Sequence, residues 1–370
     1  MKKNCLIYNF GPHYRSGIFK AIDQENRFDF YFGDKGYGVQ EHVKKIDYTI
    51  LKNFKSELSN FTTIKPFYFQ IGVLRLLFKD YKKYVISTEY FCISTWIFLI
   101  LSKILNKKVY LWSHGWYGNE GTLKTIVKLI FFKLSNGIFL YGNHAKKLMI
   151  KKKFNENKLH VIYNSLDTKK QLKYRLQCNK TNIFYERFNN HDPVLCFIGR
   201  IHKQKKIEQI IQAIKVLKDK GDFFNLLVIG DGLEKEKLIN TCKELGIEQR
   251  CWFYGESYSE KEISNLIYNS SLCISPGNVG LTAIHSMNYG TPVFTNDDFA
   301  NQGPEFESII PYETGNFFKK NAVDDMVDKI QEWFNNNYDR NEIRKQCFQR
   351  VDDYYNIEYQ LKIINTIMDN

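Results

Sequence analysis

In the second half of the sequence, a strongly apolar run is followed by a glycine, an arginine and a lysine. Gly199 and Arg200 close the run that starts at Val194, and Lys205 opens an amphipathic segment. Arginine offers phosphate oxygens a planar fork of donors and lysine offers a point charge, so the pair suits a diphosphate. The alternative is ordinary surface charge. The spacing therefore predicts an anion site at the end of a strand, with that alternative open.

A second segment of small residues, Ser275–Thr282, follows another apolar run. It contains Gly277, Asn278 and Gly280, and we expect a helix to begin near Val279 or Gly280. Backbone N–H groups at a helix start, with the positive end of the helix dipole, favour an anion. The glycines also fit a tight turn that needs their backbone freedom. Both interpretations can hold at once.

These segments belong to an alternation of short apolar runs with helix-period segments. Apolar strands between amphipathic helices indicate parallel sheets covered on both faces, so we predict an α/β fold. The predicted strands are Cys5–Phe10, Phe28–Phe32, Tyr84–Ser87, Val109–Trp112, Ile138–Tyr141, His160–Tyr163, Val194–Gly199, Asn225–Gly230, Cys251–Gly255, Ser271–Ser275 and Pro292–Thr295. The predicted helices are Phe91–Leu105, Leu123–Leu134, Lys205–Lys220, Glu234–Leu245 and Ser259–Asn269.

The predicted elements divide into two Rossmann-like domains with an interdomain cleft between their sheet edges, where open α/β sheets bind ligands. We expect an N-terminal domain over 1–170 and a polar linker over 171–192. A C-terminal domain follows over 193–350. A last helix over 351–370 is expected to pack back toward the first domain.

Charge is divided unevenly along the 370 residues. Residues 1–190 carry 33 basic and 13 acidic side chains, whereas 191–370 carry 20 and 27. The first half is therefore expected to meet something anionic. The eight cysteines show no C-x-x-C spacing and indicate a reducing compartment. No signal peptide is apparent, and the apolar run Phe91–Leu105 is too short to span a bilayer, so we expect a buried helix and a cytoplasmic protein.

Basic residues alternate with apolar ones in two segments of the first half. Lys124, Lys128 and Lys133 lie among aliphatic and aromatic residues, and a second cluster comprises Lys146, Lys147, Lys151, Lys152 and Lys153. Basic amphipathic helices are typical of peripheral attachment to an anionic membrane surface, here the inner face of the plasma membrane. The alternative is two ordinary helices with solvated lysines. Nucleic acid is a weaker candidate, because no recognition module is visible.

The ordered set of motifs resembles the retaining glycosyltransferases of family 4, which use nucleotide sugars and have the two-domain GT-B fold. The set comprises Gly199-Arg200 with Lys205, Val228–Gly232, Phe253-Tyr254-Gly255, Gly280-Leu281 and Gly290–Val293. The resemblance is strong over Val194–Phe318. It is weaker in the first half, where Leu111–Gly115 resembles the strand of the catalytic histidine.

The resemblance implies that the domain over 1–170 lies on the acceptor side and that the domain over 193–350 binds the nucleotide sugar. It also implies a role for each matching residue. Arg200 and Lys205 would hold the donor's diphosphate as catalytic groups, and His114 would contact the donor sugar. The remaining donor-binding residues would be Gly17, Gly199, Tyr254, Gly277, Asn278, Gly280, Leu281, Thr282, His285 and Glu305. The donor would be linked to UDP or GDP, and neither a cofactor nor a metal would be needed.

Two positions depart from the family's pattern of paired glutamates. Gly277 stands where the first glutamate would lie near the donor sugar, and His285 stands where the second would lie near the ribose. His285 can still hydrogen-bond ribose hydroxyls, whereas Gly277 has no side chain to offer. Either the donor sugar is recognised differently here, or the donor site is degenerate. The intact surrounding pattern favours the first interpretation.

The resemblance thus implies a retaining hexosyltransferase that acts on a polysaccharide, lipopolysaccharide or capsule precursor. The expected acceptor is a lipid-linked saccharide. The sequence contains no G-x-x-x-x-G-K-[ST], Asp-x-Asp or Gly-x-Ser-x-Gly motif, which argues against P-loop, metal-dependent transferase and serine hydrolase chemistry. The alternative function is a non-catalytic protein that binds nucleotides or nucleic acid on the same fold.

Overall fold

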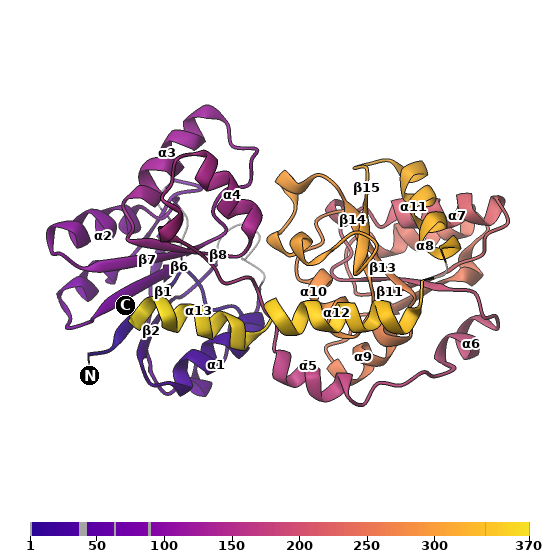
Figure 1. Cartoon of the computed structure of the whole chain (residues 1–370), viewed down its shortest axis with the longest axis horizontal. Coiled ribbons are helices and arrows are strands. Elements are labelled where there is room, and N and C mark those ends of the chain that lie inside the picture. Colours follow the sequence, from indigo (N-terminus) through magenta and orange to yellow (C-terminus); the bar gives the residue numbers. More distant parts are fainter. Residues whose placement is uncertain (1, 37–42, 63, 88–89, 337, 370) are drawn as a thin grey trace. The chain divides into compact units, whose positions relative to one another are not determined.

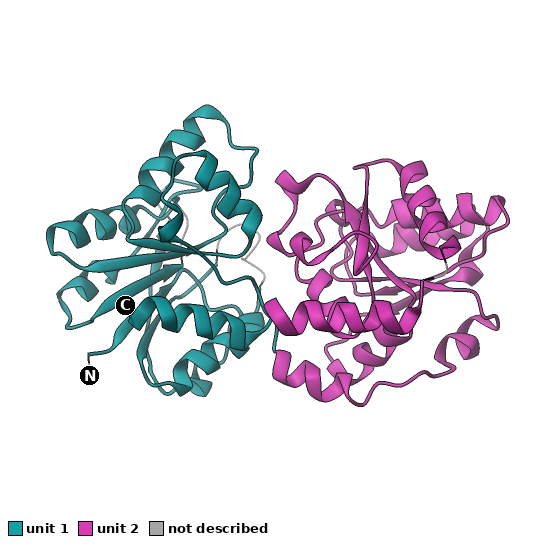
Figure 2. Ribbon diagram, viewed as in Figure 1, with its two compact units in different colours: residues 1–167, 356–370 teal, residues 168–355 magenta. Residues whose placement is uncertain are grey.

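The structure, a computed structural model, describes residues 2–36, 43–62, 64–87, 90–336 and 338–369. The chain forms two compact units, coloured separately in Figure 2. Unit 1 comprises residues 1–167 and 356–370, and unit 2 comprises 168–355. Each contains a parallel sheet with helices packed on it (Figure 1), so the predicted α/β fold with two parallel-sheet domains is confirmed.

Unit 1 is built on a parallel sheet of seven described strands in the order β3-β2-β1-β6-β7-β8-β9. Because β2 and β3 lie on one side of β1 and β6 on the other, the strand order reverses between β1 and β6. The strands are β1 (Asn4–Tyr8), β2 (Phe28–Gly33), β3 (Phe54–Leu58), β6 (Lys83–Ser87), β7 (Lys108–Ser113), β8 (Gly137–Leu140) and β9 (Leu159–Val161), with an antiparallel pair β4 (Asn60–Thr62) and β5 (Tyr68–Gln70). The helices are α1 (Ser16–Gln24), α2 (Ile93–Ile104), α3 (Thr122–Lys133), α4 (Asn143–Lys151) and α13 (Ile357–Asp369).

The core of unit 1 lies on both faces of its sheet. Side chains of β1 alternate between two apolar clusters, with Cys5 and Ile7 in one and Leu6 and Tyr8 in the other. Burial on both faces is what a parallel sheet requires, and it explains the unbroken apolar run in the sequence. The second cluster also takes in side chains of α13, namely Ile357, Ile364 and Met368. The last helix of the chain therefore completes the core of the unit that begins it.

Helix α2 corrects the prediction of a buried helix over Phe91–Leu105. One face buries Phe98 and Leu99 together with small polar residues, while Ile97, Ile100 and Ile104 are exposed on the other. The apolar run therefore forms a surface helix that has one buried face and one exposed face. No helix in the described ranges is long and apolar enough to cross a membrane.

Unit 2 has a parallel sheet of six described strands in the order β12-β11-β10-β13-β14-β15, which reverses between β10 and β13. The strands are β10 (Val194–Ile198), β11 (Asn225–Ile229), β12 (Cys251–Gly255), β13 (Leu272–Ser275), β14 (Val293–Asn296) and β15 (Gly315–Phe318). The helices are α5 (Thr168–Arg175), α6 (Ile183–Phe188), α7 (Glu208–Asp219), α8 (Lys235–Glu244), α9 (Glu260–Asn269), α10 (Thr282–Asn288), α11 (Val323–Asn335) and α12 (Arg340–Tyr354).

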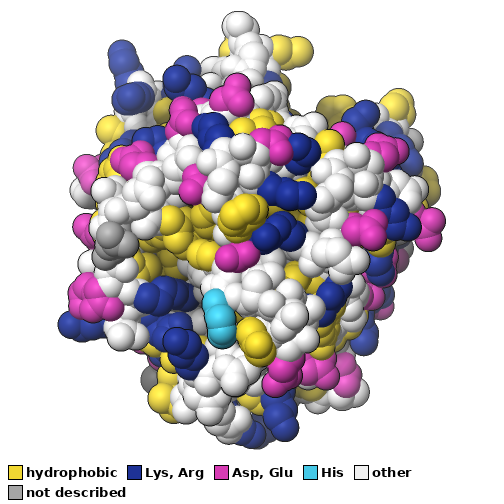
Figure 3. All heavy atoms as spheres, turned by 90° about the vertical axis from the view of Figure 1, so that its right-hand side faces the viewer, with side chains coloured by type: hydrophobic (Ala, Val, Ile, Leu, Met, Phe, Trp, Pro, Cys, Tyr) yellow, Lys and Arg dark blue, Asp and Glu magenta, His cyan; other side chains and the backbone are white. Residues whose placement is uncertain are grey.

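The helices of unit 2 follow the periodicity of the sequence. In α7 the apolar stripe Ile210, Ile211, Ile214 and Leu217 is buried, as the helical spacing predicts. The stretch 171–192, predicted as a linker, contains α6 and most of α5 and lies within unit 2. On the face of this unit seen in Figure 3, basic and acidic side chains are interspersed.

Candidate functional sites

The predicted diphosphate site lies in unit 2, where the strand order reverses between β10 and β13. Gly199 follows β10 with φ at 142°, a backbone conformation that favours glycine. Arg200 comes next and is exposed. Lys205 ends a short 3₁₀ turn, and its Nζ donates to the carbonyl oxygen of Asn278 at 2.5 Å. The loops after β10 and β13 are thereby joined at the carboxyl edge of the sheet.

Gly277 is where the two loops meet most closely. A Cβ atom at this position would lie 2.2 Å from the carbonyl oxygen of Gln204 and 2.9 Å from the Cα atom of Lys205. Both neighbours are backbone, which cannot move aside as a flexible side chain would. The departure from a glutamate at Gly277 therefore has a physical reason, since the loop after β10 occupies the space of a side chain.

Two buried amides that the sequence analysis missed hold the loop after β13. Asn296, at the end of β14, donates through Nδ2 to the carbonyl oxygens of Pro276 and Gly277 at 2.7 and 3.0 Å. Gln302 donates to Gly277 at 3.1 Å and accepts from the backbone N–H of Val279 at 2.8 Å. The signal available in the sequence was a pair of amide side chains after an apolar strand.

The helix expected near Val279 or Gly280 begins at Thr282. Gly280 has φ at 49°, and Leu281 is the residue that precedes the seven-residue helix α10. Thr282 donates from Oγ1 to the carbonyl oxygen of Ile198 at 3.1 Å, which ties α10 to the end of β10. The three residues predicted to contact phosphate thus lie at the same sheet edge as Lys205.

Electrostatics at this edge involve one further predicted residue. Burial lowers the pKa of Lys205, and the nearby carboxylate of Glu305 opposes that shift. Glu305 lies on a 3₁₀ turn, Pro304–Ser308, and is 4% exposed. No group of three or more His, Cys, Asp or Glu side chains in the described part of the chain could hold a metal ion.

His285 contacts a carboxylate that the sequence analysis did not identify. Its Nε2 lies 2.8 Å from Oε1 of Glu260, and the same oxygen accepts from the Tyr289 hydroxyl at 2.5 Å and from Gln171 at 3.3 Å. Burial alone would raise the pKa of Glu260, but these hydrogen bonds, first of all that of His285, hold it at about 2. His285 therefore positions an ionised carboxylate.

Two of the predicted donor-binding residues, Tyr254 and Gly17, have contacts within their own units. Tyr254 lies on the edge strand β12 and donates from its hydroxyl to Oε2 of Glu262 at 3.2 Å. Gly17 lies in α1, where a Cβ atom would come within 2.8 Å of Cδ1 of Ile357 in α13. Helix packing thus accounts for a small residue at Gly17, and its role toward a ligand stays a prediction.

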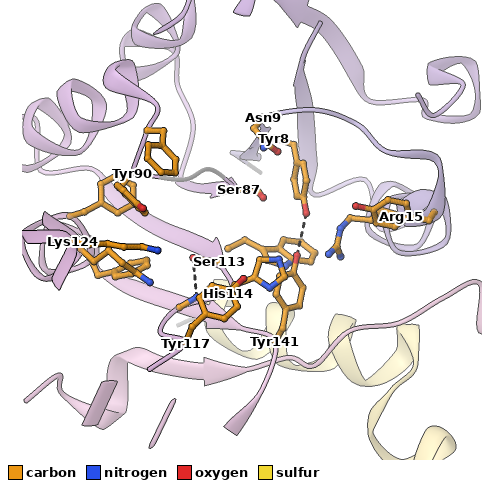
Figure 4. A pocket seen from close by; sticks show the side chains of 17 residues that line it. Tyr8, Asn9, Arg15, Ser87, Tyr90, Ser113, His114, Tyr117, Lys124 and Tyr141 are labelled. Atoms are coloured by element: carbon orange, nitrogen blue, oxygen red, sulfur yellow. Dashed lines mark hydrogen bonds between the residues drawn. The ribbon is translucent and has the colours of Figure 1, made fainter. Parts of the chain in front are cut away.

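His114 lies in a pocket of about 290 Å³ in unit 1, shown in Figure 4. The pocket opens at the carboxyl ends of β1, β6, β7 and β8, and so includes the place where the strand order of this sheet reverses. The lining residues are Tyr8, Asn9, Tyr14, Arg15, Ser87, Tyr90, Phe91, Trp112, Ser113, His114, Gly115, Tyr117, Lys124, Lys128, Phe131, Phe132 and Tyr141. Of these lining residues, only His114 is among the predicted site residues.

The side chain of His114 is exposed to the solvent of the pocket, with two aromatic rings beside it. Its ring centroid lies 4.7 Å from that of Tyr141 and 6.0 Å from that of Tyr117. The protein packed around the ring, followed by the charges of Arg15 and Lys128, lowers the pKa of His114. At neutral pH the ring is therefore uncharged and offers one donor and one acceptor nitrogen.

Comparison with known proteins identifies a family that part of the chain matches. Residues 179–350, which lie within unit 2, match the family described as "Glycosyl transferases group 1". The capsular polysaccharide biosynthesis glycosyltransferase CapM of Staphylococcus aureus is 25% identical over 232 residues, 62% of this chain and 60% of that protein. The lipopolysaccharide 1,6-galactosyltransferase of Salmonella typhimurium is 30% identical over 140 residues, 36% of this chain and 37% of that protein. The matches therefore span less than two thirds of these relatives.

Solved structures extend the similarity to the whole chain. HepE of Anabaena, in complex with UDP, has a TM-score of 0.73 at 13% identity and covers 100% of both chains. The lipopolysaccharide outer core galactosyltransferase WaaB, in its apo form, has a TM-score of 0.69 at 17% identity and covers 99% of both. At such low identity the similarity establishes the fold alone.

Proposed function

We propose, from the premise that this chain belongs to the group 1 glycosyl transferases and has the GT-B fold, that it transfers a sugar from a nucleotide-sugar donor to a saccharide acceptor. The observation that carries the proposal is the joined pair of loops in unit 2, where Lys205 contacts Asn278. The names of the relatives support a capsule or lipopolysaccharide precursor as acceptor. Transfer is proposed to retain anomeric configuration.

The proposed chemistry is electrostatic. The donor's diphosphate would be held by Arg200 and Lys205, with the backbone N–H groups of Gly280 to Thr282 beside it. Negative charge grows on that diphosphate as the glycosidic bond breaks, and donors fixed in place beforehand stabilise the transition state. Retention then requires the acceptor to attack the face that the nucleoside diphosphate leaves. No metal enters this scheme.

The contact between the two loops limits which residues can recognise the donor sugar. Because Gly277 packs against the backbone of Gln204, this position offers the sugar no side chain. We propose that other groups recognise the sugar, with Asn278 and Glu305 the nearest predicted candidates. UDP-linked sugars are the first donors to test, because HepE, which shares the fold, was solved with UDP.

Substitution of the two basic residues tests the function. Arg200→Ala and Lys205→Ala should each lower turnover by about 100-fold, the size seen when one donor to developing charge is lost. Release of UDP and transfer of radiolabelled sugar are the measurements. Lys243→Ala, which removes an exposed lysine of α8, is the matched control. If both variants fold and keep the turnover of the wild type, the assignment of Arg200 and Lys205 to a transferase site is wrong. If the wild type binds the donor but transfers no sugar, a non-catalytic nucleotide-binding protein is favoured.

We also propose that unit 1 docks on an anionic membrane surface on the cytoplasmic side. Exposed isoleucines line α2, at Ile97, Ile100 and Ile104, and α3 adds Ile126 and Ile130. The two helices contact each other through Trp96 and Phe131, whose ring centroids are 5.0 Å apart. Apolar side chains with lysines around them suit a bilayer interface.

The lysines near these helices are not equivalent. Lys103, Lys124 and Lys133 are exposed, whereas Lys128, which the sequence analysis grouped with them, is buried with its Nζ 2.6 Å from Oε1 of Glu120. In the second basic segment Lys146 pairs with Glu156 at 2.9 Å. The exposed lysines there are Lys147, Lys151, Lys152 and Lys153. These exposed residues are the ones proposed to meet anionic lipid.

A further inference from the structure

A small hollow lies at the amino edge of the unit 1 sheet. It has a volume of about 100 Å³, and its lining includes Ile138 near the start of β8 and Leu159 at the start of β9. These two residues are partners in the parallel pairing of the strands. His114, in contrast, follows the last residue of β7 and lies at the carboxyl edge. The hollow is therefore separate from the pocket that contains His114 and plays no part in the proposed transfer.

Three lysines surround this hollow. Lys133 ends α3, Lys153 lies two residues after α4, and Lys158 ends the 3₁₀ turn that precedes β9. All three are exposed, and none of their ammonium groups has a hydrogen bond or an ion pair with a residue in the described ranges. No Asp or Glu occurs among the described residues that line the hollow. The lining therefore carries positive charge without a carboxylate beside it.

Neighbouring groups neutralise only part of this charge. The helices α3 and α4 both end at this edge, and about half a negative charge at each helix end leaves an excess of about two positive charges. Backbone N–H groups after α4 already donate to the carbonyl oxygens of Ile150 and Met149, at 2.8 and 3.1 Å. Glu156, the acidic residue nearest in the sequence, pairs with Lys146 at 2.9 Å. An anion is therefore attracted into the hollow.

The floor of the hollow is apolar. Phe132, Ile138 and Leu159 line it and are at most 4% exposed. The hydroxyl of Ser135, which also lines the hollow, donates to the carbonyl oxygen of Phe132 at 2.8 Å, so its proton is used within its own turn. Apolar atoms screen charge less than water does, so the three ammonium groups attract an anion more strongly here than on an open surface.

We propose that the hollow binds a phosphomonoester group, held between the ammonium groups of Lys133, Lys153 and Lys158. Such a group carries nearly two negative charges at pH 7, and lysines bind phosphate as point charges. A phosphodiester has a single charge and matches the excess less well. The phosphomonoester can belong to a soluble ligand or to the head group of a membrane lipid. The lipid source rests on the proposed membrane contact of unit 1, whereas the soluble source rests on the hollow alone.

Calorimetry with the purified full chain tests the soluble source. Glycerol 3-phosphate and inorganic phosphate are the probes, and dimethyl phosphate, a diester with one charge, is the reference. Co-sedimentation with phosphatidylcholine vesicles tests the lipid source. One set contains phosphatidate, which ends in a phosphomonoester, and the other contains phosphatidylserine at the same measured surface charge. In at least one of the two assays, the monoester should bind about 10-fold more tightly than its reference.

Two double variants that remove equal charge show whether the hollow is responsible. Lys133→Gln combined with Lys158→Gln should abolish the preference for the monoester. Lys147→Gln combined with Lys151→Gln removes two exposed lysines of α4 that do not line the hollow. This second variant should keep the preference, even where its overall binding to anionic vesicles falls. Circular dichroism checks that both variants are folded.

Three results would overturn the proposal. One is equal affinity for monoester and reference in both assays. Another is a preference that survives the replacement of Lys133 and Lys158. The third is an equal loss of preference in the two double variants, which would assign the effect to the total charge of the surface.

The same measurements separate this proposal from the proposed function. If phosphomonoesters bind in the hollow but no nucleotide sugar is turned over, the hollow stands and the transferase assignment fails. If turnover depends on Arg200 and Lys205 while the monoesters show no preference, the transferase assignment stands and the proposal for the hollow fails.

Discussion

Glu260 is a partly buried carboxylate whose ionisation contributes to stability. Its pKa is about 2 in the folded chain, below the ordinary 4.5. The unfolded chain therefore binds a proton first as the pH falls, so the contribution is complete above about pH 4.5 and is lost down to about pH 2. A shift of this size corresponds to about 3 kcal/mol, as an order of magnitude.

Glu260→Gln should flatten the dependence of unfolding free energy on pH between about 4.5 and 2 and lower stability at pH 7. Urea unfolding at a series of pH values measures both effects. Glu244→Gln, at an exposed carboxylate of α8, should keep the full acid dependence. If the unfolding free energy of Glu260→Gln fell as steeply with decreasing pH as that of the wild type, the contacts with His285 and Tyr289 would not be what holds the carboxylate ionised.

Among individual residues, the sequence predicted those whose chemistry depends on a local motif. Lys205 contacts Asn278, because glycine-bearing loops after parallel strands return to the same sheet edge, and the role of both residues toward a donor stays a prediction. Glu260 could not be identified, because it acquires its role from residues distant in the chain. It bonds Gln171 and His285.

The loop after β10 and the loop after β13 form one element of the proposed donor site, with Gly277 at their contact. Gly277→Ala places a Cβ atom 2.2 Å from the carbonyl oxygen of Gln204, so one loop must move. We expect a loss of about 1–3 kcal/mol of stability, typical of overpacking, and weaker binding of UDP. Gly121→Ala is the control, because no atom lies within 4 Å of a Cβ there.

Thermal unfolding and calorimetry with UDP are the measurements for these glycine variants. If Gly277→Ala were as stable as the wild type and bound UDP equally well, the close approach of the two loops would not be needed for the site.

Among the elements, apolar strands were predictable and polar ones were not. The central strands of both sheets are buried on both faces and read as apolar runs. Strand β3, Phe54–Leu58, lies at the edge of its sheet with Lys55, Ser56 and Glu57 exposed, so its pattern resembles a loop. The sequence predicted that helix α2 is buried, whereas one of its faces is exposed. Hydropathy alone does not distinguish a face that packs inward from one that meets solvent.

For the whole molecule, attachment to anionic membranes can be measured with vesicles that contain phosphatidylserine. Replacing Ile97, Ile100 and Ile104 by glutamine should weaken binding, and so should charge reversal at Lys147, Lys151, Lys152 and Lys153. Added salt should weaken binding of the wild type and of the isoleucine variant, since it screens the lysines.

Two exposed apolar residues of unit 2, Phe223 and Leu233, provide the control for the isoleucine variant. Their replacement by glutamine should leave vesicle binding unchanged, and UDP binding should survive every one of these changes. Vesicle binding that ignores salt, isoleucines and lysines alike would contradict the proposed membrane contact.

The return of α13 to the core of unit 1 has a consequence for synthesis on the ribosome. The first 167 residues emerge without Ile357, Ile364 and Met368, which belong to their apolar core. Unit 2, residues 168–355, must be translated before those side chains exist. At about 5–20 residues per second this takes roughly 10–40 s. During that interval the nascent first unit presents an open apolar surface beside α1, whereas unit 2 contains its whole core as soon as it leaves the exit tunnel.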